Sequence, residues 1–287
     1  MDTTAAQVTC LSRAPSSGTY RVHLDGGRSV IAKLYFGAAK WKATKERNII
    51  DSLSNNGVIR TARVLGYDQL EIYDATVLIT SDLGECTLWG AIEAGRYSYH
   101  GGLSLVGRLL ANFHDIDLAI TAADDEPLAT KFERLARWHL SILDRNPQDG
   151  LASHVEPALD TLVRLCRQPN PQIGCHGDLH PANVVTQVRS NVSAAHLVDF
   201  ESAVRCPLEY DLAKSVATSS ALGDHDRMAL LAGYGDRRPV SEELLYAFVV
   251  FHVVDGWVHA ALLEGRDRSL WRSRIDEVVA RYAPLFQ

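Results

Sequence analysis

Short apolar runs separated by polar turns fill the first eighty residues, and this alternation is typical of β-strands. The tripeptide Asp25-Gly26-Gly27 predicts a hairpin turn between two of the runs, because glycine tolerates the positive φ that such turns require. The segment Ala39–Asn55 instead repeats its large apolar residues at near-helical spacing and stops before Gly57, which predicts a helix. The predicted strands are Val8–Leu11, Gly18–Leu24, Ser29–Tyr35, Arg63–Leu65 and Ala75–Thr80.

After Gly84 the pattern changes to longer segments with helical spacing of their apolar residues. Two short apolar runs, Val184–Thr186 and His196–Phe200, interrupt them and are predicted strands. A small β-rich part that precedes a larger helical part indicates the α+β class. The predicted helices are Leu103–His114, Pro127–Leu143, Pro157–Cys166, Tyr210–Leu222, Ser241–Glu264 and Leu270–Tyr282.

Composition favours a cytoplasmic protein that can bury its own core. Apolar residues make up 46% of the 287 residues, enough for one large domain or two small lobes. No run of eighteen apolar residues occurs, and Met1–Gln7 lacks the basic start and apolar stretch of a signal peptide, so we expect no membrane association. The five cysteines are spread along the chain without a Cys-x-x-Cys pair, which fits reduced thiols in the cytosol.

The distribution of charge bears on possible partners. A net charge of −6 makes nucleic acid a poor partner, because phosphate backbones bind basic patches. Residues 1–80 hold ten Lys/Arg against seven Asp/Glu, whereas the rest of the chain holds 19 against 28. A basic part near a triphosphate and an acidic part near the acceptor would suit a cationic acceptor. Solubility alone could produce the same asymmetry.

The stretch Cys175–Asn183 carries the most specific chemistry, together with the later Leu197–Phe200. Asp178 is followed by Asn183 at the spacing Asp-x-x-x-x-Asn, and Asp199 lies sixteen residues beyond Asn183. Phosphoryl transfer needs one carboxylate to orient or deprotonate a hydroxyl, and a carboxylate and an amide oxygen to hold magnesium. The first spacing is that of protein kinases, but Glu201 replaces the glycine of their Asp-Phe-Gly motif. The pattern therefore predicts a kinase-like phosphotransferase.

The segment His176-Gly177-Asp178, with His180, Pro181 and Asn183, resembles the aminoglycoside phosphotransferase and choline kinase superfamily. Tyr210-Asp211-Leu212-Ala213 resembles its post-metal motif. The resemblance implies a bilobal protein-kinase-like fold, with a nucleotide-binding lobe at 1–80, a hinge at 81–85, and a catalytic and acceptor-binding lobe at 86–287. It also implies ATP as phosphoryl donor with Mg²⁺, although the sequence does not exclude GTP. We expect a monomer or weak dimer.

Lys33 lies in a strand-like run, the setting of the kinase lysine that contacts the α- and β-phosphates. An ammonium group among apolar neighbours needs a partner, which in kinases is a glutamate on the following helix. Between Lys33 and Arg60 the acidic residues are Glu46 and Asp51. Glu46, which is mid-helix and has the longer reach, is the predicted partner. The alternative is that both acids are solvated charges.

Two further groups are expected to bind the nucleotide. Small residues between the first two strands could cradle a phosphate with their backbone N–H groups and hydroxyls; they are Ser16, Ser17, Gly18 and Thr19. The resemblance places the adenine on backbone groups of the hinge, near Thr80, Ser81, Asp82 and Leu83.

Asp178 is the predicted base or hydroxyl-orienting group, and Asn183 and Asp199 are the predicted magnesium ligands, since their oxygens are hard donors. Isolated Asp and Asn residues in loops are usually turn formers, but three at these spacings favour a site. Glu201 could face the metal or the acceptor.

The neighbouring polar residues are given structural roles. We expect His176 to be a hydrogen-bonding residue of the loop, and His180 has no assigned role. The two histidines do not form the usual helical metal pair, because Gly177 and Pro181 indicate a loop. Asp211 is predicted to be a helix N-cap.

The apolar helix predicted at Ser241–Glu264 carries His252, Asp255 and His259 on one face, because they are three and four residues apart. An unpaired aspartate in this setting would be costly to bury. One interpretation is a satisfied core network, or a cap at a kink near Gly256. The other is a polar wall of the acceptor pocket, with Trp257 at its rim, that holds a cationic substrate.

The sequence thus predicts an ATP- and Mg²⁺-dependent O-phosphotransferase acting on a small molecule. The resemblance favours a cationic antibiotic, either an aminoglycoside or a viomycin- or capreomycin-type peptide, and hence a role in antibiotic resistance. A metabolic kinase for choline, homoserine or a sugar is the first alternative. A nucleotide-binding pseudoenzyme is the second, although no catalytic carboxylate is missing.

Overall fold

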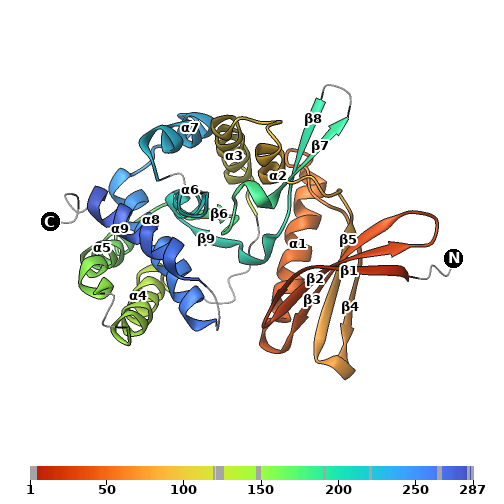
Figure 1. Ribbon diagram of the computed structural model, residues 1–287, viewed down its shortest axis with the longest axis horizontal. Helices are drawn as coiled ribbons and strands as arrows, with labels where there is room; N and C mark the ends of the chain where they lie inside the picture. Colours follow the sequence, from red (N-terminus) through yellow and green to blue (C-terminus); the bar gives the residue numbers. More distant parts are fainter. Residues whose placement is uncertain are drawn as a thin grey trace. The chain divides into compact units, whose positions relative to one another are not determined.

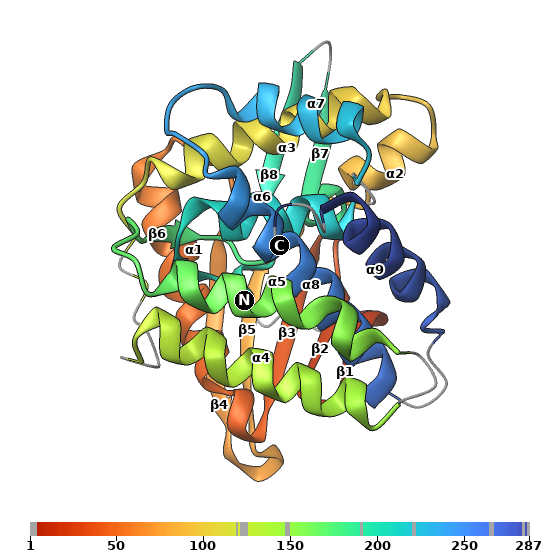
Figure 2. The same ribbon diagram turned by 90° about the vertical axis from the view of Figure 1, so that its left-hand side faces the viewer.

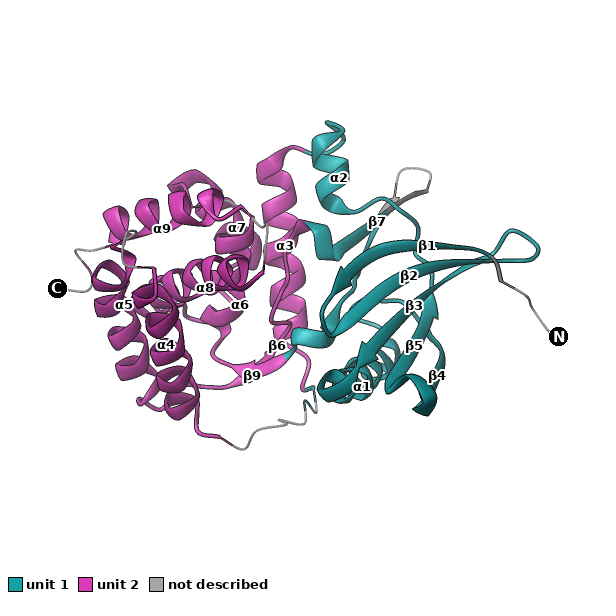
Figure 3. Ribbon diagram, turned by 60° about the horizontal axis from the view of Figure 1, so that its bottom comes forward, with its two compact units in different colours: residues 1–97, 118–121, 182–203 teal, residues 98–117, 122–181, 204–287 magenta. Residues whose placement is uncertain are grey.

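The computed structural model describes residues 5–118, 120, 126–146, 150–189, 192–219, 222–263, 267–282 and 285. The chain forms two compact units (Figure 3). Unit 1 consists of residues 1–97, 118–121 and 182–203, and unit 2 consists of residues 98–117, 122–181 and 204–287. Unit 1 contains the main β-sheet and unit 2 is mainly helical. The predicted α+β class is therefore confirmed.

The sheet of unit 1 has five antiparallel strands in the order β1-β2-β3-β5-β4. Gly26 and Gly27 have φ values of 87° and 75°, as the predicted hairpin between the second and third strands requires. All five strands coincide with predicted ones, and the first and fourth extend well beyond them. Their bounds are β1 Ala5–Ala14, β2 Ser17–Leu24, β3 Ser29–Phe36, β4 Val64–Leu70 and β5 Ala75–Ser81.

Helix α1, Trp41–Asn56, packs against β3, β4 and β5 (Figure 1). Its buried face includes Ile49, Ile50 and Leu53, which recur at helical spacing. The helix ends at Gly57, whose φ of 71° turns the backbone out of the helix while its N–H bonds to the Leu53 carbonyl. It begins two residues later than predicted, because residues 37–39 form a 3₁₀ turn.

A β-hairpin that is distant in sequence belongs to the same unit. Strands β7, Val184–Arg189, and β8, Val192–Leu197, pair with each other, and short 3₁₀ turns precede and follow them. The prediction of a strand as far as Phe200 was wrong, because the strand ends at Leu197 and a 3₁₀ turn starts at Phe200. The short helix α2, Leu88–Glu93, was not predicted.

Helix α8 forms the centre of unit 2, where α4, α5, α6 and α9 pack against it (Figure 2). Helix α7 was not predicted, and the predicted helix at Pro157 begins at Leu151 because the proline is tolerated inside it. Residues 220, 221 and 264, at the ends of two predicted helices, lie outside the described residues. The helices are α3 Tyr99–His114, α4 Leu128–Asp144, α5 Leu151–Cys166, α6 Leu208–Thr218, α7 Asp224–Tyr234, α8 Glu242–Leu262 and α9 Ser269–Tyr282. The two-stranded sheet of unit 2 pairs β6, Ile173–Cys175, with β9, Val204–Cys206.

Two glycines allow α3 and α7 to cross at close range. A Cβ atom on Gly107 would lie 2.1 Å from the Leu230 carbonyl oxygen, and one on Gly233 would lie 2.1 Å from the Ser104 carbonyl oxygen. No real Cβ contact is that short, so any other residue would push the two helices apart.

Among the described residues, α8 is the one helix long and apolar enough to cross a membrane by length and composition. However, 78% of its most apolar window is buried within the protein. Its apolar side chains therefore form the core of unit 2.

Candidate active site

Lys33 is the centre of a charged cluster in unit 1. Its Nζ lies 2.5 Å from Asp199 Oδ1, 2.9 Å from Glu201 Oε2 and 3.4 Å from Glu46 Oε2. The Lys33 side chain is 11% exposed, so the carboxylates replace the water that a free ammonium group would bind. The structure thus brings Lys33 and Glu46 together and adds two further acids to the pair.

The cluster fixes the protonation of its members. Burial, the largest single influence, lowers the pKa of Lys33, but Glu46, Asp199, Tyr35 and Glu201 outweigh it and raise that pKa well above its usual value. Burial and the Glu46 carboxylate raise the pKa of Tyr35 as well. Lys33 therefore remains an ammonium group, and Tyr35 remains a phenol that donates a hydrogen bond.

Glu46 connects three parts of unit 1. Its carboxylate accepts hydrogen bonds from the Tyr35 hydroxyl on β3 and, at 3.2 Å, from the backbone N–H of Phe200. Because Phe200 directly follows Asp199, this bond holds the proposed metal motif against α1. Glu46 is 4% exposed, whereas Asp51, the other acid on the helix, is exposed.

The register of the β7–β8 hairpin brings Asn183 and Asp199 together. Val184 pairs with Leu197, and the Val198 N–H donates to the Asn183 carbonyl at 3.2 Å. Asp199 has a φ of 70°, which is left-handed, and such backbone conformations in non-glycine residues concentrate at functional sites. Two hard oxygen side chains thus extend from adjacent ends of one hairpin.

The expected phosphate loop is shorter than predicted. Pro15 and Ser16 form the turn between β1 and β2, whereas Gly18 and Thr19 lie in the strand predicted from Gly18, and Ser17, placed before that strand by the prediction, is paired within it as well. Thr19 lies opposite Lys33 in the β2–β3 register, which places this end of the strand beside the charged cluster.

The segment proposed as the hinge is held by a salt bridge. Arg21 on β2 donates to Asp82 at 2.7 Å and to Glu85 at 2.5 Å. Asp82 also accepts bonds from the Ser29 hydroxyl and from the backbone N–H of Gly84. Burial raises the pKa of Asp82, but these donors outweigh it and lower that pKa below its usual value. The Asp82 side chain therefore organises the segment.

The other residues predicted to contact the adenine lie at the end of β5 and just after it. Thr80 and Ser81 belong to β5, and the Ser81 hydroxyl oxygen accepts the Arg63 N–H. Leu83 follows Asp82 outside the strand.

One face of α6 holds the loop of unit 2 that was predicted to be catalytic. Asp211 accepts the backbone N–H groups of His176 and Gly177 at 2.6 and 2.7 Å. One turn later the Ser215 hydroxyl donates to the Leu179 carbonyl, and Lys214 Nζ lies 3.6 Å from Asp178 Oδ1. These α6 residues are three and four positions apart, so they share a face. The helix fixes the backbone on both sides of Asp178.

The prediction that Asp211 is an N-cap was wrong. Helix α6 begins at Leu208, so Asp211 lies in its first turn, and its side chain is completely buried. Burial raises the pKa of Asp211, but the hydrogen bond and charge of His114 and the loop N–H groups outweigh it and keep that pKa below its usual value. His176 is buried and its backbone bonds to Asp211, which agrees with a structural role in the loop.

His114, Cys175 and Asp211 lie close enough together to be considered as metal ligands. However, His114 Nε2 bonds to Asp211, its Nδ1 bonds to the Tyr234 hydroxyl, and both Asp211 oxygens accept loop N–H groups. Burial raises the pKa of the Cys175 thiol well above its usual value. The cluster is therefore a hydrogen-bonded anchor.

His252, Asp255 and His259 share a face of α8 but differ in environment. His252 is buried and donates from Nε2 to the Tyr210 carbonyl at 3.1 Å, and burial lowers its pKa to about 3. Asp255 Oδ1 lies 3.1 Å from Nε2 of the buried His139 and 3.5 Å from Nε2 of the exposed His259. His252 thus belongs to the core network, and Asp255 and His259 reach the surface of unit 2.

Asp255 carries a negative charge despite its burial. Burial raises the pKa of Asp255, but the hydrogen bond from His139 and the charges of Lys214 and His259 outweigh it and lower that pKa to about 2. Trp257 is 1% exposed, so its predicted place at a pocket rim was wrong. Gly256 lies inside α8, where the Trp271 ring packs against it, and does not end the helix.

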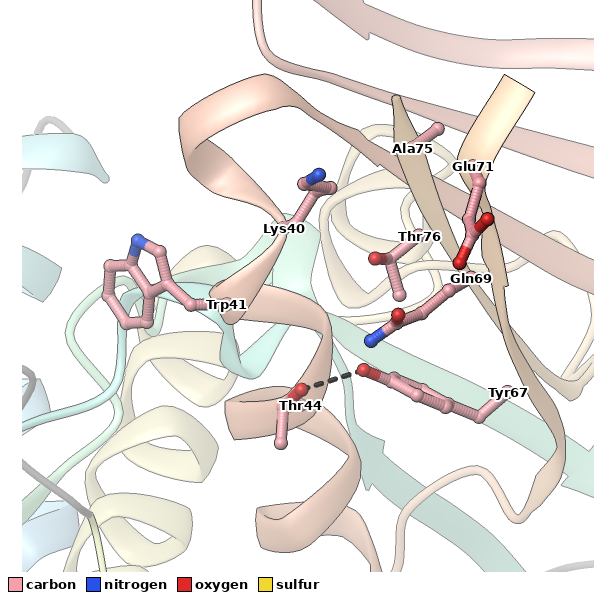
Figure 4. A pocket seen from close by; sticks show the side chains of 8 residues that line it. All are labelled: Lys40, Trp41, Thr44, Tyr67, Gln69, Glu71, Ala75 and Thr76. Atoms are coloured by element: carbon pink, nitrogen blue, oxygen red, sulfur yellow. Dashed lines mark hydrogen bonds between the residues drawn. The ribbon is translucent and has the colours of Figure 1, made fainter. Parts of the chain in front are cut away.

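A cavity of ≈ 170 Å³ lies in unit 1 beside the start of α1 (Figure 4). The Thr44 hydroxyl and the Tyr67 hydroxyl are hydrogen-bonded within it. None of the predicted site residues lines it. Its lining residues are Lys40, Trp41, Thr44, Tyr67, Gln69, Glu71, Ala75 and Thr76.

Residues that the sequence reasoning missed contact predicted site residues, among them Arg21, His139 and Lys214. The signal for Lys214 was present, because it follows Asp211 at helical spacing, directly after the recognised motif. Arg21 and His139 gave no such signal, since their partners lie 61 and 116 residues away.

Comparison with known proteins gives a consistent picture. The sequence matches the phosphotransferase enzyme family over residues 12–244. A search of curated protein sequences found no match.

The fold is shared with solved kinase structures of low sequence identity. A thermostable mutant of an aminoglycoside phosphotransferase is 15% identical with a TM-score of 0.74, covering 97% of this chain and 96% of that one. A microcompartment-associated aminopropanol kinase is 16% identical with a TM-score of 0.70, covering 98% and 93%. A choline kinase from Streptococcus pneumoniae is 16% identical with a TM-score of 0.65, covering 97% and 94%.

Proposed function

The chain belongs to the phosphotransferase enzyme family, and from this premise we propose that it transfers the terminal phosphoryl group of ATP to a hydroxyl group of a cationic small molecule. The class of reaction, phosphoryl transfer to an alcohol group of a small molecule, follows from the family. The identity of donor, metal and acceptor is the proposal. Its main support is the charged cluster that joins Lys33, Glu46 and Asp199 in unit 1.

Unit 1 supplies the groups for the nucleotide. Lys33 would bind the triphosphate, and its ion pairs with three carboxylates support this role because they hold a charged ammonium group in a largely buried position. Asn183 and Asp199 fit a magnesium ion, because an amide oxygen and a 39% exposed carboxylate are hard donors on one hairpin. When bound, Mg²⁺ would neutralise charge on the phosphates. Glu201, 2.9 Å from Lys33, is a further carboxylate at this position.

Asp178 would align the acceptor hydroxyl. The oxygen of that hydroxyl forms a bond to the terminal phosphorus while the bond to the ADP oxygen breaks, and Asp178 accepts the hydroxyl proton. Asn183 follows Asp178 by five residues in the sequence, and this spacing supports the proposal that the two act in one reaction.

The acceptor is proposed to be cationic. Asp255 is a largely buried carboxylate that stays ionised, and one of its two histidine neighbours, His259, is exposed. Aminoglycosides, aminopropanol and choline, which give the similar proteins their names, all combine a hydroxyl with an amine or quaternary ammonium group. An antibiotic acceptor, and hence resistance, is our first candidate. A metabolic amino alcohol is the second.

The remaining expectations form part of the proposal. We propose residues 1–80 as the nucleotide-binding lobe, residues 81–85 as the hinge, and residues 86–287 as the catalytic and acceptor-binding lobe. We also propose a cytoplasmic monomer or weak dimer without nucleic acid or membrane partners, with ATP as the donor and GTP as the alternative. A pseudoenzyme is disfavoured because Asp178, Asn183 and Asp199 are all present.

The test is nucleoside triphosphate turnover with Mg²⁺ across a panel of acceptors. The panel holds aminoglycosides, viomycin-type peptides, choline, aminopropanol, homoserine and simple sugars, each with ATP and with GTP. Asp178→Asn should lower kcat about 10²- to 10⁴-fold, the usual contribution of a positioned base. Asp160→Asn, an exposed aspartate on α5, is the matched control.

Turnover with an amine-bearing acceptor that Asp178→Asn abolishes would support the proposal. Turnover only with neutral sugars would refute the cationic acceptor while leaving the reaction class intact. Nucleotide binding without turnover on any acceptor would favour the pseudoenzyme.

A further inference from the structure

Lys214 occupies the position on α6 between the two residues that hold the catalytic loop. Its ammonium group lies 3.6 Å from Asp178 Oδ1, and its side chain is 19% exposed. Among the described residues, Asp178 is the one carboxylate within ion-pair distance of Lys214. A largely buried cation therefore stands directly beside the proposed hydroxyl-orienting group.

The same ammonium group acts on α8. Helices α6 and α8 pack together, and the Tyr210 carbonyl bonds to His252. Lys214 follows Tyr210 by one helical turn, and Asp255 follows His252 by three residues. The positive charge of Lys214 lowers the pKa of both His252 and Asp255, in agreement with this packing. Lys214 is thus paired with Asp178 and lies on the helix that packs against the one carrying Asp255.

This order matters for an acceptor that carries both an amine and a hydroxyl. Either carboxylate could bind the ammonium group of the acceptor, but only binding at Asp255 leaves Asp178 free for the hydroxyl. A fixed cation beside Asp178 repels a second cation there, because like charges at this separation destabilise each other. Asp255 has histidines, not Lys214, within ion-pair distance, so the repulsion from Lys214 is weaker there than at Asp178, and its partner His259 is exposed.

We propose that Lys214 is a specificity-determining residue that keeps the amine of the acceptor away from Asp178 and directs it to Asp255. The inference rests on the proposed function, since it needs a cationic acceptor. It extends that function by explaining how the chain avoids binding the acceptor with its amine at Asp178, an orientation in which the hydroxyl cannot react. Lys214 needs no contact with the phosphoryl group for this role.

The experiment compares Lys214→Met and Lys214→Arg with the wild type. Lys131→Met, on α4, is the matched control because Lys131 is the other lysine of unit 2. Kinetics are measured with choline and aminopropanol, and tetramethylammonium and propylamine are the hydroxyl-free inhibitors. Thermal unfolding shows that each variant is folded.

In Lys214→Met the hydroxyl-free amines should inhibit about tenfold more tightly, the change that removal of about 1.4 kcal/mol of repulsion produces. The kcat should fall while KM stays constant or falls, because more substrate binds in the wrong orientation. Lys214→Arg should restore wild-type behaviour. A merely structural role would instead weaken amine binding.

Folded Lys214→Met with unchanged or weaker inhibition by the amines would overturn the inference. So would a loss of activity through KM alone. If the wild type itself fails to phosphorylate any amine-bearing alcohol, the proposed function fails, and the inference falls with it. The two failures are distinguishable because the second one appears in the wild type before any variant is made.

Discussion

Replacement of Glu46 should expose the energetic link between the nucleotide cluster and the stability of unit 1. In Glu46→Ala the buried Tyr35 hydroxyl and Phe200 N–H both lose a charged acceptor, and Lys33 loses one of three carboxylates. In Glu46→Gln the side-chain shape and one acceptor oxygen remain. The two variants thus separate the loss of charge from the loss of both hydrogen bonds.

The magnitude follows from those contacts. A hydrogen bond to a charged group contributes about 1.5 to 3 kcal/mol, and Tyr35 and Phe200 are both completely buried, so water cannot replace the acceptor freely. We expect Glu46→Ala to lower the free energy of unfolding by about 3 to 5 kcal/mol. Glu46→Gln should cost about 1 to 2 kcal/mol, because Lys33 keeps Asp199 and Glu201 as partners.

Urea unfolding followed by tryptophan fluorescence measures the change, and calorimetric titration with Mg·ATP measures the affinity. Both variants should bind Mg·ATP at least about tenfold more weakly, since Lys33 and the Asp199 motif lose their support. Asp51→Ala is the matched control on the same helix and should change stability by less than about 0.5 kcal/mol. A Glu46→Ala protein as stable as Asp51→Ala would refute the reasoning.

Three further predictions concern unit 2. Asp211→Asn should lower the free energy of unfolding by about 3 to 5 kcal/mol and should also lower kcat. The reason is that the completely buried negative charge, which bonds to His114 and to two loop N–H groups, is lost. Urea unfolding and turnover measure the two effects. Gly233→Ala should destabilise by about 1 to 3 kcal/mol in the same assay, the opposite of the usual effect in a helix, because its Cβ would meet the Ser104 carbonyl. His252 has a pKa of about 3 in the fold against a usual 6.5, so the unfolded chain takes up its proton first as the pH falls. Its contribution is complete above pH 6.5 and is lost toward pH 3, about 2 kcal/mol of it by pH 5; stability measured against pH should therefore fall less steeply in His252→Gln, and an equal slope would contradict the assigned environment.

Local patterns in the sequence were sufficient for much of unit 1 and for the chemistry. The alternation of Ser29–Tyr35 identified β3 and placed Lys33 inside it, and the mid-helix position and longer side chain of Glu46 selected it over Asp51. Strand alternation and helical repeats are local properties, so they can be seen without knowing the fold. The spacing from Asp178 to Asn183 and Asp199 likewise lies in one continuous stretch, which is why the reaction class could be predicted.

The interpretation of polar residues was less secure where their partners are distant in sequence. Asp211 looked like an N-cap because it stands near the start of a helix, yet the helix begins earlier and its side chain turns inward to the loop. Trp257 was placed at a rim although it is buried. A sequence shows which residues share a helix face, but the packing of the neighbouring helix decides whether that face is exposed to solvent or buried.

The sequence by itself determined the α+β class, most of the strands and helices, and the class of reaction, and it named the three residues proposed for phosphoryl transfer. Only the tertiary structure decided which charges are paired: Arg21 with Asp82, His139 with Asp255, and Lys214 with Asp178. The partners in these three pairs are 61, 116 and 36 residues apart, respectively, and no local periodicity encodes such contacts. Burial makes the pairing specific, because an ion removed from water is stable only beside an opposite charge, and the packing of distant elements supplies that charge.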